Sequence, residues 1–334
     1  MTKKRLPLTV IGGFLGAGKT TLLNRWLHDA AGVRMAVLVN DFGAINIDAD
    51  LIEATSGDTV ALTNGCVCCQ IGDDLTRALI RVLDTTPPFD AVVVEASGVS
   101  DPWRIAQMGR ADPGLSLDGV VVLVDASAAL AQSRDPLLAD TLERQLKAAD
   151  LIVVNHCDRA TDDERARVGD WIALIAGATP QFETTQARVP LPMLSGLALS
   201  SAQPARASAT PSSCDPHEHA EGAHAHDHEH GHEHDDPAHG TLFDTWLCRP
   251  ARVFSSAALR DWLKETPPGV LRLKGVLRTG TDGSDTGWSE LQFAGRHGTL
   301  RRASAPAAGA ALVAIGLRGQ LPTAALSATF DAPG

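Results

Sequence analysis

The chain has 334 residues, of which 44% are hydrophobic and 21% charged, and its formal net charge at pH 7 is −11. Since one domain usually has about 100–200 residues, the length predicts about two domains, and the composition excludes a chain that is disordered throughout. The negative charge and the 4% aromatic content, with no tyrosine, argue against a nucleic-acid-binding protein.

The amino terminus has some features of a secretory signal peptide, because Lys3, Lys4 and Arg5 precede an apolar stretch over residues 6–15. This stretch continues into the glycine-rich segment 16–20, and cleavage there would destroy the strongest motif of the chain, so a signal peptide is disfavoured. No other segment has about 18 consecutive apolar residues, so we expect no membrane span and no membrane partner. Clustered cysteines suit a reducing compartment, and we expect a cytoplasmic protein.

The order of the apolar runs predicts an α/β fold. Five runs rich in Val, Ile or Leu are expected to be buried strands, at 8–11, 35–39, 90–95, 119–124 and 151–154. Helical patterns lie between them, notably at 20–31, 137–149 and 162–176. Apolar strands that alternate with helices predict a doubly wound, mainly parallel sheet, which binds ligands at the carboxyl ends of its strands.

The chain divides into three parts. Residues 1–195 contain the alternating strands and helices. Residues 196–240 are rich first in Ala, Ser and Pro and then in His and acidic residues, which predicts a flexible linker. Residues 241–334 contain a short helical pattern and two apolar strand patterns, which predict a small α+β domain.

Residues 13–20 read Gly-Phe-Leu-Gly-Ala-Gly-Lys-Thr and fit the P-loop pattern. Glycines let backbone N–H groups point at a phosphate, and the helix that follows offers its unpaired N-terminal amides. Lys19 would contact the β- and γ-phosphates, and the Thr20 hydroxyl would bind Mg²⁺. A chance glycine-rich turn is disfavoured, because the motif follows a strand and opens a helix. The candidate nucleotide-binding residues here are Gly13, Gly16, Ala17, Gly18, Lys19, Thr20 and Thr21.

Two further strand ends carry candidate nucleotide contacts. Glu95 ends the third strand and would hold Mg²⁺ directly or through water, so Lys19, Thr20 and Glu95 form the candidate catalytic group. The alternative is an exposed glutamate at a strand end. Asn155 and Asp158 follow the fifth strand as Asn-His-Cys-Asp, and an Asp at this place accepts two hydrogen bonds from guanine that adenine does not offer.

Three thiols lie within Cys66-Val-Cys68-Cys69, after Asn64-Gly65. Thiolates are soft ligands for Zn²⁺ or Cu(I), and three of them supply part of a tetrahedral set. Asp41 or a histidine of the linker would complete it. Buried cysteines acting as small hydrophobes are the alternative, which the polar neighbours disfavour.

The linker is a second candidate metal-binding segment. Nine acidic side chains and no Lys or Arg lie between Ser208 and Cys248. Histidines alternate with these carboxylates and predict many weak sites for divalent metals, whereas the alternative is a solvated spacer. The histidines are His217, His219, His224, His226, His228, His230, His232, His234 and His239.

Together these motifs resemble the CobW family of metal-handling P-loop GTPases, relatives of UreG and HypB, and in particular its zinc chaperones. The resemblance rests on the segments 12–24, 40–48, 65–69 and 95–102, on the His-rich linker and on the C-terminal domain. It implies the P-loop nucleoside-triphosphatase fold, GTP hydrolysis with Mg²⁺, binding of Zn²⁺, Co²⁺ or Ni²⁺ at the cysteines, and delivery of the metal to a client metalloprotein. It also implies that the cysteine segment and the segment after the second strand connect the metal to the γ-phosphate.

The sequence departs from this family at two places. His156 stands where the guanine motif usually has Lys, so the affinity for guanine is expected to fall while selectivity survives through Asp158. Asp41 stands where Glu is common, and Ala44 lies where the family has an acidic residue nearby. The metal site would then have fewer or shorter ligands.

The leading hypothesis is a GTP-dependent zinc chaperone with slow intrinsic hydrolysis, because no Gln or Arg finger is evident. The same chemistry with cobalt or nickel would serve cobalamin synthesis or an enzyme such as nitrile hydratase. A metal-storage protein and a small-molecule kinase are the alternatives from other classes. The expected partners are a guanine nucleotide and a client protein, and a homo-oligomer is left open.

Overall fold

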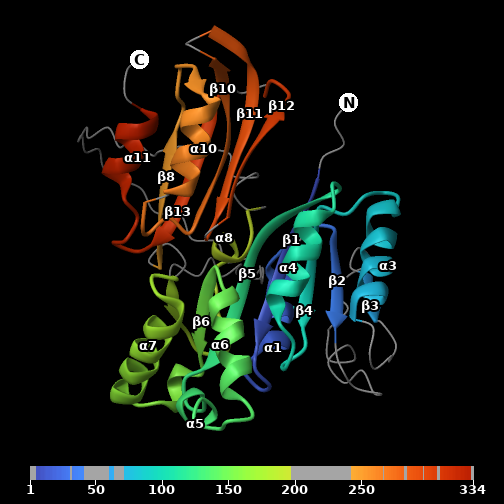
Figure 1. Cartoon of the computed structure of the whole chain (residues 1–334), viewed down its shortest axis with the longest axis vertical. Helices are drawn as coiled ribbons and strands as arrows, with labels where there is room; N and C mark the ends of the chain where they lie inside the picture. Colours follow the sequence, from blue (N-terminus) through green and yellow to red (C-terminus); the bar gives the residue numbers. More distant parts are fainter. Residues whose placement is uncertain are drawn as a thin grey trace, which may run out of the picture.

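The computed structural model describes residues 5–30, 32–40, 60–63, 71–196, 242–265, 267–281, 284–295, 297–306 and 309–331. We call residues 5–196 of this set the N-terminal region and residues 242–331 the C-terminal region. Each region has its own sheet and its own buried cluster, and the two are joined side by side (Figure 1).

The N-terminal region contains a seven-stranded sheet in the order β3-β2-β4-β1-β5-β6-β7. Every pairing in it is parallel. Parallel strands are buried on both faces, and β1, β4 and β6 are accordingly buried along their whole length. The strands are β1 (Leu6–Gly13), β2 (Met35–Asn40), β3 (Val60–Thr63), β4 (Ala91–Ala96), β5 (Leu115–Asp125), β6 (Leu151–Asn155) and β7 (Gln181–Glu183).

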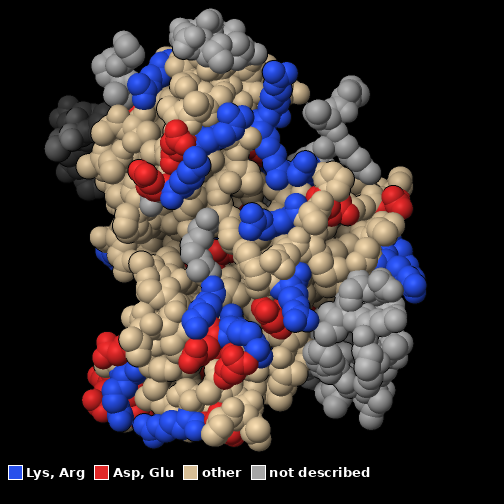
Figure 2. Space-filling view, viewed as in Figure 1, with Lys and Arg blue, Asp and Glu red and all other residues tan. Residues whose placement is uncertain are grey.

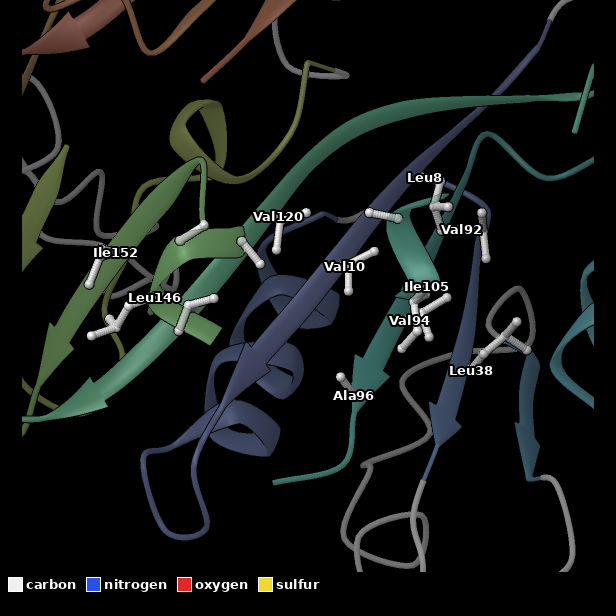
Figure 3. Close-up of a cluster of buried hydrophobic side chains, with 14 of the residues drawn as sticks. Leu8, Val10, Leu38, Val92, Val94, Ala96, Ile105, Val120, Leu146 and Ile152 are labelled. Carbon is white, nitrogen blue, oxygen red and sulfur yellow. The ribbon is translucent and has the colours of Figure 1, made fainter. Parts of the chain in front are cut away.

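Helices cover both faces of this sheet. The helices are α1 (Lys19–Asp29), α3 (Ile71–Asp84), α4 (Pro102–Ala111), α5 (Ala129–Gln132), α6 (Ala139–Ala148), α7 (Asp162–Ala176) and α8 (Leu191–Leu194), with the 3₁₀ turn η1 (Cys157–Arg159). One buried cluster joins the sheet to α3, α4, α6 and α7, and Figure 3 shows Ile105 of α4 and Leu146 of α6 against it. A second cluster places α1 and α8 on the other face.

Local signals explain where two of these helices begin. Thr161 and Glu164 form a reciprocal capping box at the start of α7. Asp101 accepts a hydrogen bond from the Trp103 N–H at the start of α4, and Pro102 follows at the first helical position, where its missing N–H costs nothing. The first residues of both helices are thus determined by capping residues that can be recognised in the sequence.

The C-terminal region is a six-stranded sheet in which β12-β11-β10-β13-β8 are antiparallel neighbours and β9 pairs with β10. Phe330 of α11 is fully buried and contacts three aromatic rings, those of Trp246, Phe254 and Trp262. The elements are β8 (Phe243–Cys248), β9 (Phe254–Ser255), α10 (Ser256–Lys264), β10 (Arg272–Thr281), β11 (Ser284–Ala294), β12 (His297–Ala303), β13 (Ala311–Leu317) and α11 (Thr323–Phe330).

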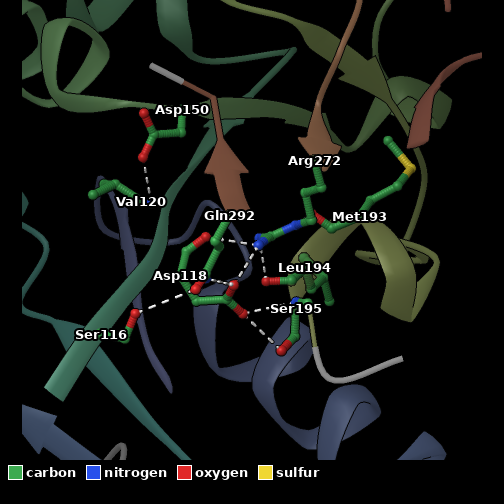
Figure 4. A network of polar contacts seen from close by, with 10 residues as sticks. Ser116, Asp118, Val120, Asp150, Met193, Leu194, Ser195, Arg272 and Gln292 are labelled. Atoms are coloured by element: carbon green, nitrogen blue, oxygen red, sulfur yellow. Dashed lines mark hydrogen bonds and ion pairs between the residues drawn. The ribbon is translucent and has the colours of Figure 1, made fainter. Parts of the chain in front are cut away.

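A buried polar network joins the two regions (Figure 4). Arg272 of β10 lies 3.0 Å from the Asp118 carboxylate of β5, and their side chains are only 5% and 2% exposed. Arg272 also donates hydrogen bonds to the carbonyls of Met193 and Leu194, and Ser195 donates one to Asp118. Residues 193–195, near the end of the N-terminal region, are therefore held by hydrogen bonds to a strand of each sheet.

The predicted fold is confirmed, with longer and additional elements. The doubly wound parallel sheet and the separate C-terminal sheet with its helices both form. β5 begins at Leu115 rather than at Gly119, because its charged Asp118 is buried by the ion pair with Arg272. The sequence interpretation did not include α3, α4, α5, α8, α11, β3, β7, β8, β9, β11 or β12. Among the described residues, no helix is long and apolar enough to cross a membrane.

Candidate functional site

The candidate residues meet at the carboxyl edge of the parallel sheet. Ile11 of β1 lies opposite Glu95 of β4 and Val121 of β5 in the register, so the loop after β1 begins close to both neighbours. Asp125 of β5 lies opposite Asn155 of β6 at the same edge. Open α/β sheets bind ligands at this edge, as the sequence predicted.

The glycines of the loop 13–18 are required by its conformation. Gly18 has φ +100°, and a Cβ built on it would lie 2.4 Å from the side-chain nitrogen of Asn155. Gly13 has φ +130°, and its Cβ would lie 2.4 Å from the carbonyl oxygen of Leu123. Side chains other than hydrogen do not fit at either place, so the backbone forms an open cradle ahead of α1.

Lys19 and Thr20 begin α1 beside Glu95. The Lys19 ammonium donates a hydrogen bond to the Phe14 carbonyl at 3.3 Å and lies within the loop, where its side chain is mostly buried. The Thr20 hydroxyl donates a 3.0 Å hydrogen bond to a Glu95 carboxylate oxygen. Glu95 is only 2% exposed, so it is not the exposed strand-end glutamate of the alternative interpretation.

This set of donors fits a magnesium ion. Mg²⁺ binds hard oxygen ligands and uses one or two protein groups together with phosphate oxygens and water. A hydroxyl and a carboxylate in direct contact, next to a phosphate cradle, provide those groups through Thr20 and Glu95.

Asn155 joins two loops of the site. It is fully buried, and its amide nitrogen donates a 2.9 Å hydrogen bond to the Ala17 carbonyl. Its amide oxygen accepts a 2.8 Å hydrogen bond from the Ala187 N–H. Asn155 therefore positions the P-loop and the loop after β7 relative to each other. Asp158, in η1, has an exposed side chain at the same edge.

His156 pairs with a carboxylate that the sequence interpretation gave no role. His156 has the left-handed conformation, with φ 61°, and its Nδ1 lies 2.9 Å from Asp125 Oδ2. Burial opposes ionisation of Asp125, but hydrogen bonds from Ser127 and His156 outweigh it and lower the pKa of this carboxyl. A partly buried His–Asp pair therefore occupies the place where Lys is usual in the guanine motif.

The loop after β7 was also missed. Gln186 and Ala187 have φ values of 52° and 53°, which is uncommon for residues other than glycine. Arg25 of α1 donates a 2.8 Å hydrogen bond to the Gln186 carbonyl, and Ala187 donates to Asn155. The sequence gives no signal for this turn, whereas Asp125 was visible as a polar strand end.

The candidate metal ligands lie outside the described residues. These are Asp41, Cys66, Cys68, Cys69, His217, His219, His224, His226, His228, His230, His232, His234 and His239. Within the ranges that the structure describes, no group of three or more His, Cys, Asp or Glu side chains is arranged to hold a metal ion. Two of the described residues are cysteines, Cys157 and Cys248; both are buried and neither forms a disulfide bond.

Comparison with known proteins agrees with the motifs. Residues 7–182 match the sequence model of the CobW/HypB/UreG nucleotide-binding domain. The chain belongs to this family. Residues 243–333 match the C-terminal domain of the cobalamin synthesis protein CobW, so the resemblance inferred from the motifs is confirmed.

Several curated relatives are similar over part of their length. The zinc chaperone CobW of Pseudomonas aeruginosa is 32% identical over 231 residues, covering 59% of this chain and 61% of that protein. The zinc chaperone YjiA of Escherichia coli is 34% identical over 197 residues, covering 57% and 60%. A zinc-regulated GTPase metalloprotein activator of Schizosaccharomyces pombe is 32% identical, covering 55% and 47%. The chain thus spans less than two thirds of the length of these relatives.

Two solved structures are similar at low identity. Zn(II)-bound YjiA GTPase of E. coli has 20% identity and a TM-score of 0.44, covering 97% of this chain and 98% of that one. HypB of Helicobacter pylori in complex with nickel has 16% identity and a TM-score of 0.37, covering 54% and 79%. Both scores are low, so the family membership rests on the sequence match.

Proposed function

We propose that this protein hydrolyses GTP and uses the hydrolysis to control the capture and release of zinc for a client metalloprotein. The observation that carries the proposal is the Thr20–Glu95 pair beside a cradle that excludes any Cβ at Gly13 and Gly18. Relatives named zinc chaperones and a zinc-regulated GTPase activator support the choice of zinc and of a client.

The phosphate end of the site would act by positioning and by charge. Lys19 and the loop amides would hold the β- and γ-phosphates, while Thr20 and Glu95 would hold Mg²⁺. When bound, the metal ion neutralises charge that develops on the phosphate oxygens.

The base end would select guanine through Asp158. The Asp158 carboxylate is exposed and would accept hydrogen bonds from guanine N1–H and its amino group. The pairing of His156 with Asp125 directs the imidazole towards β5, so it does not provide the alkyl stem with which Lys covers a base. We expect selectivity for GTP over ATP with moderate affinity.

The metal would bind at Cys66, Cys68 and Cys69, with Asp41 as a further ligand. Both segments continue from strand ends at the nucleotide edge: Asp41 follows Asn40 directly, and Cys66 follows Thr63 by three residues. Thr63 and Glu95 are both opposite Val39 in the register, so Thr63 lies two strands from Glu95, about 10 Å away at the usual strand spacing. This short path supports coupling between zinc and the γ-phosphate. The reduced thiols that it needs suit the cytoplasm.

GTP turnover with and without Zn²⁺, in the wild type and in Cys68→Ser, tests this function. We expect slow hydrolysis that Zn²⁺ changes in the wild type but not in Cys68→Ser, because the variant lacks one soft ligand. Lys19→Ala, which removes the phosphate contact, is the control for contaminating activity and should not hydrolyse GTP. An equal response to Zn²⁺ in both proteins would contradict the proposed coupling. Hydrolysis of ATP at the same rate as GTP would contradict the proposed selectivity for guanine.

A further inference from the structure

The two regions enclose a cleft on the side of the N-terminal sheet away from the nucleotide edge. Its volume is about 560 Å³, within the size range of ligand-binding sites. The walls are the last turn of α4, the start of β5, the last turns of α10, and β12. Since β5 starts here and ends at Asp125, the cleft lies at the amino edge of the sheet and is separate from the nucleotide site.

Four cationic side chains line this cleft: Arg110, Arg260, Lys264 and Arg301. None of the described residues that line it is acidic. Figure 2 shows Lys and Arg side chains gathered over α10, β12 and the adjoining end of α4. This concentration is notable in a chain whose net charge is −11.

Neighbouring carboxylates offset only part of this charge. Lys264 pairs with the exposed Asp261 at 2.7 Å, and Glu290 lies opposite Arg301 across the strands. Burial lowers the pKa of Arg301, the nearby Arg5 lowers it further, and Glu290 opposes both. Because several cations line one cleft, the electrostatic potential there is positive and favours binding of an anion.

The floor of the cleft is apolar. Leu115 and Leu263 are buried, while Leu117 and Leu300 are partly exposed. A ligand that matches this lining has hydrophobic groups as well as negative charge, which is true of an acidic polypeptide segment with aliphatic side chains.

The helix ends disfavour a small phosphate ligand. Both α4 and α10 present their carboxyl-terminal turns to the cleft, through Arg110 and Lys264. Carbonyl groups and the negative end of the dipole lie there, whereas phosphate sites usually use helix N-termini. The dipole explains why cations suit these two positions, but it does not explain Arg301, which is on a strand.

A second hollow lies next to the cleft, beside α4 and α6. This second hollow, of about 390 Å³, shares His297 with the first and is lined also by Asp101, Trp103, Arg144, Lys147 and Ala148. The rings of Trp103 and His297 stack at 5.3 Å, and Arg110 lies over Trp103 at 5.7 Å. One helix, α4, thus begins seven residues after Glu95 and ends at the cationic cleft.

We propose that this cationic cleft binds an acidic, aliphatic polypeptide segment of a partner protein. The proposal rests on the function proposed above only in taking that partner to be the metal client. The binding itself needs neither nucleotide nor zinc.

A fluorescein-labelled peptide in which Glu and Leu alternate tests the proposal by fluorescence anisotropy with the full chain, free of metal and nucleotide. The variant Arg110→Glu/Arg260→Glu reverses two exposed cations of the cleft. The control Arg134→Glu/Arg167→Glu makes the same change in net charge at two exposed residues of the N-terminal region, outside the cleft. GTP affinity checks the fold of each variant and tests the nucleotide site separately.

We expect the cleft variant to bind the peptide about tenfold more weakly and the control less than about twofold more weakly. Raising the salt concentration should weaken binding to the wild type, because the rim charges are exposed. A control peptide in which Gln replaces every Glu should bind poorly, because it has no negative side chains.

Three results would overturn the proposal. These are equal binding of the Glu and Gln peptides, an equal effect of the two double variants, and no binding of the peptide at all. Displacement of the peptide by inorganic tripolyphosphate at lower concentration than by unlabelled peptide would indicate a small-anion site instead. A normal GTP affinity with any of these results would leave the nucleotide function intact.

Discussion

The side chains of Asp125 and His156 are in contact at one end of the candidate nucleotide site, within a motif that usually has Lys. Their contact of 2.9 Å is supported by two hydrogen bonds from Ser127 to the same carboxylate. The pair holds His156 in a left-handed conformation directly before η1, which carries Asp158. The geometry of the turn that carries Asp158 thus depends on a side chain of another strand.

Replacing Asp125 with Asn should lower the free energy of unfolding by about 2 kcal/mol at pH 7, because charge-assisted hydrogen bonds are lost. The folded state lowers the pKa of Asp125 below 3.8, so its ionised form stabilises the protein fully above that value. This stabilisation is lost as the pH falls through the lower folded-state pKa. The difference between wild type and variant should therefore shrink as the pH falls below about 4.

Urea unfolding of both proteins at several pH values measures this difference. Asp84→Asn, at an exposed residue of α3, is the matched control and should change stability little at any pH. A constant difference between wild type and Asp125→Asn down to the lowest pH at which the protein folds would contradict the account.

At the scale of elements, the strand–loop–helix unit from β1 to α1 is the part that the sequence predicts best. Its apolar strand, glycines and amphipathic helix are local features of the sequence, and they follow one another along the chain in the same order as the strand, loop and helix of the structure. The need for glycine at position 18 also comes from a distant residue, because the side chain of Asn155, at the end of β6, leaves no room for a Cβ there. This contact is part of the tertiary structure, so it cannot be predicted from the P-loop motif alone.

Gly18→Ala should weaken GTP binding and destabilise the protein more than Gly16→Ala does. Both positions have positive φ, at +100° and +78°, so both variants suffer backbone strain of about 1 kcal/mol. Only the Gly18 variant places a Cβ against Asn155, whereas nothing lies within 4 Å of a Cβ at Gly16. Thermal unfolding and GTP titration of the two variants measure the difference, and equal losses would refute this role of Asn155.

Other elements were predicted less well, for physical reasons that differ. The start of β5 was missed because Asp118 interrupts the apolar run, and the partner that allows its burial lies 154 residues later. β12 is an edge strand rich in polar residues and shows no clean alternation. The helix α3 was also missed, although it buries Leu75, Ala78, Leu79 and Val82 at helical spacing, a pattern from which the helix could have been predicted.

At the scale of the whole molecule, the polar network around Arg272 holds the two regions together. Its guanidinium contacts Asp118 of β5 and the carbonyls of two residues of α8, the last described helix of the N-terminal region. Gln292 of β11 adds a 3.2 Å hydrogen bond to Asp118. Nothing in the sequence pairs these residues, because they are far apart along the chain and their motifs are unrelated.

Arg272→Ala should destabilise the protein by about 3–5 kcal/mol, since it leaves the Asp118 carboxylate buried without its partner. Arg272→Met/Asp118→Asn should recover part of this loss, because neither charge then remains buried. Urea unfolding of the single and double variants measures both effects. Arg302→Ala, at an exposed residue of β12, serves as the control. If Arg272→Ala changed stability no more than this control, the network would not be the main link between the regions.

We propose that the occupancy of the zinc site and of the terminal-phosphate site affect each other across the carboxyl edge of the parallel sheet. The most direct test is the Zn²⁺ affinity of the full chain, measured in the GTP-bound and GDP-bound states with a competing chelator. Deletion of residues 215–239 removes the weak sites of the histidine-rich segment, so the titration reports the cysteines alone. We predict clearly different affinities in the two states, and Cys68→Ser should abolish the tight site in both. Equal affinities in the two states would contradict the account.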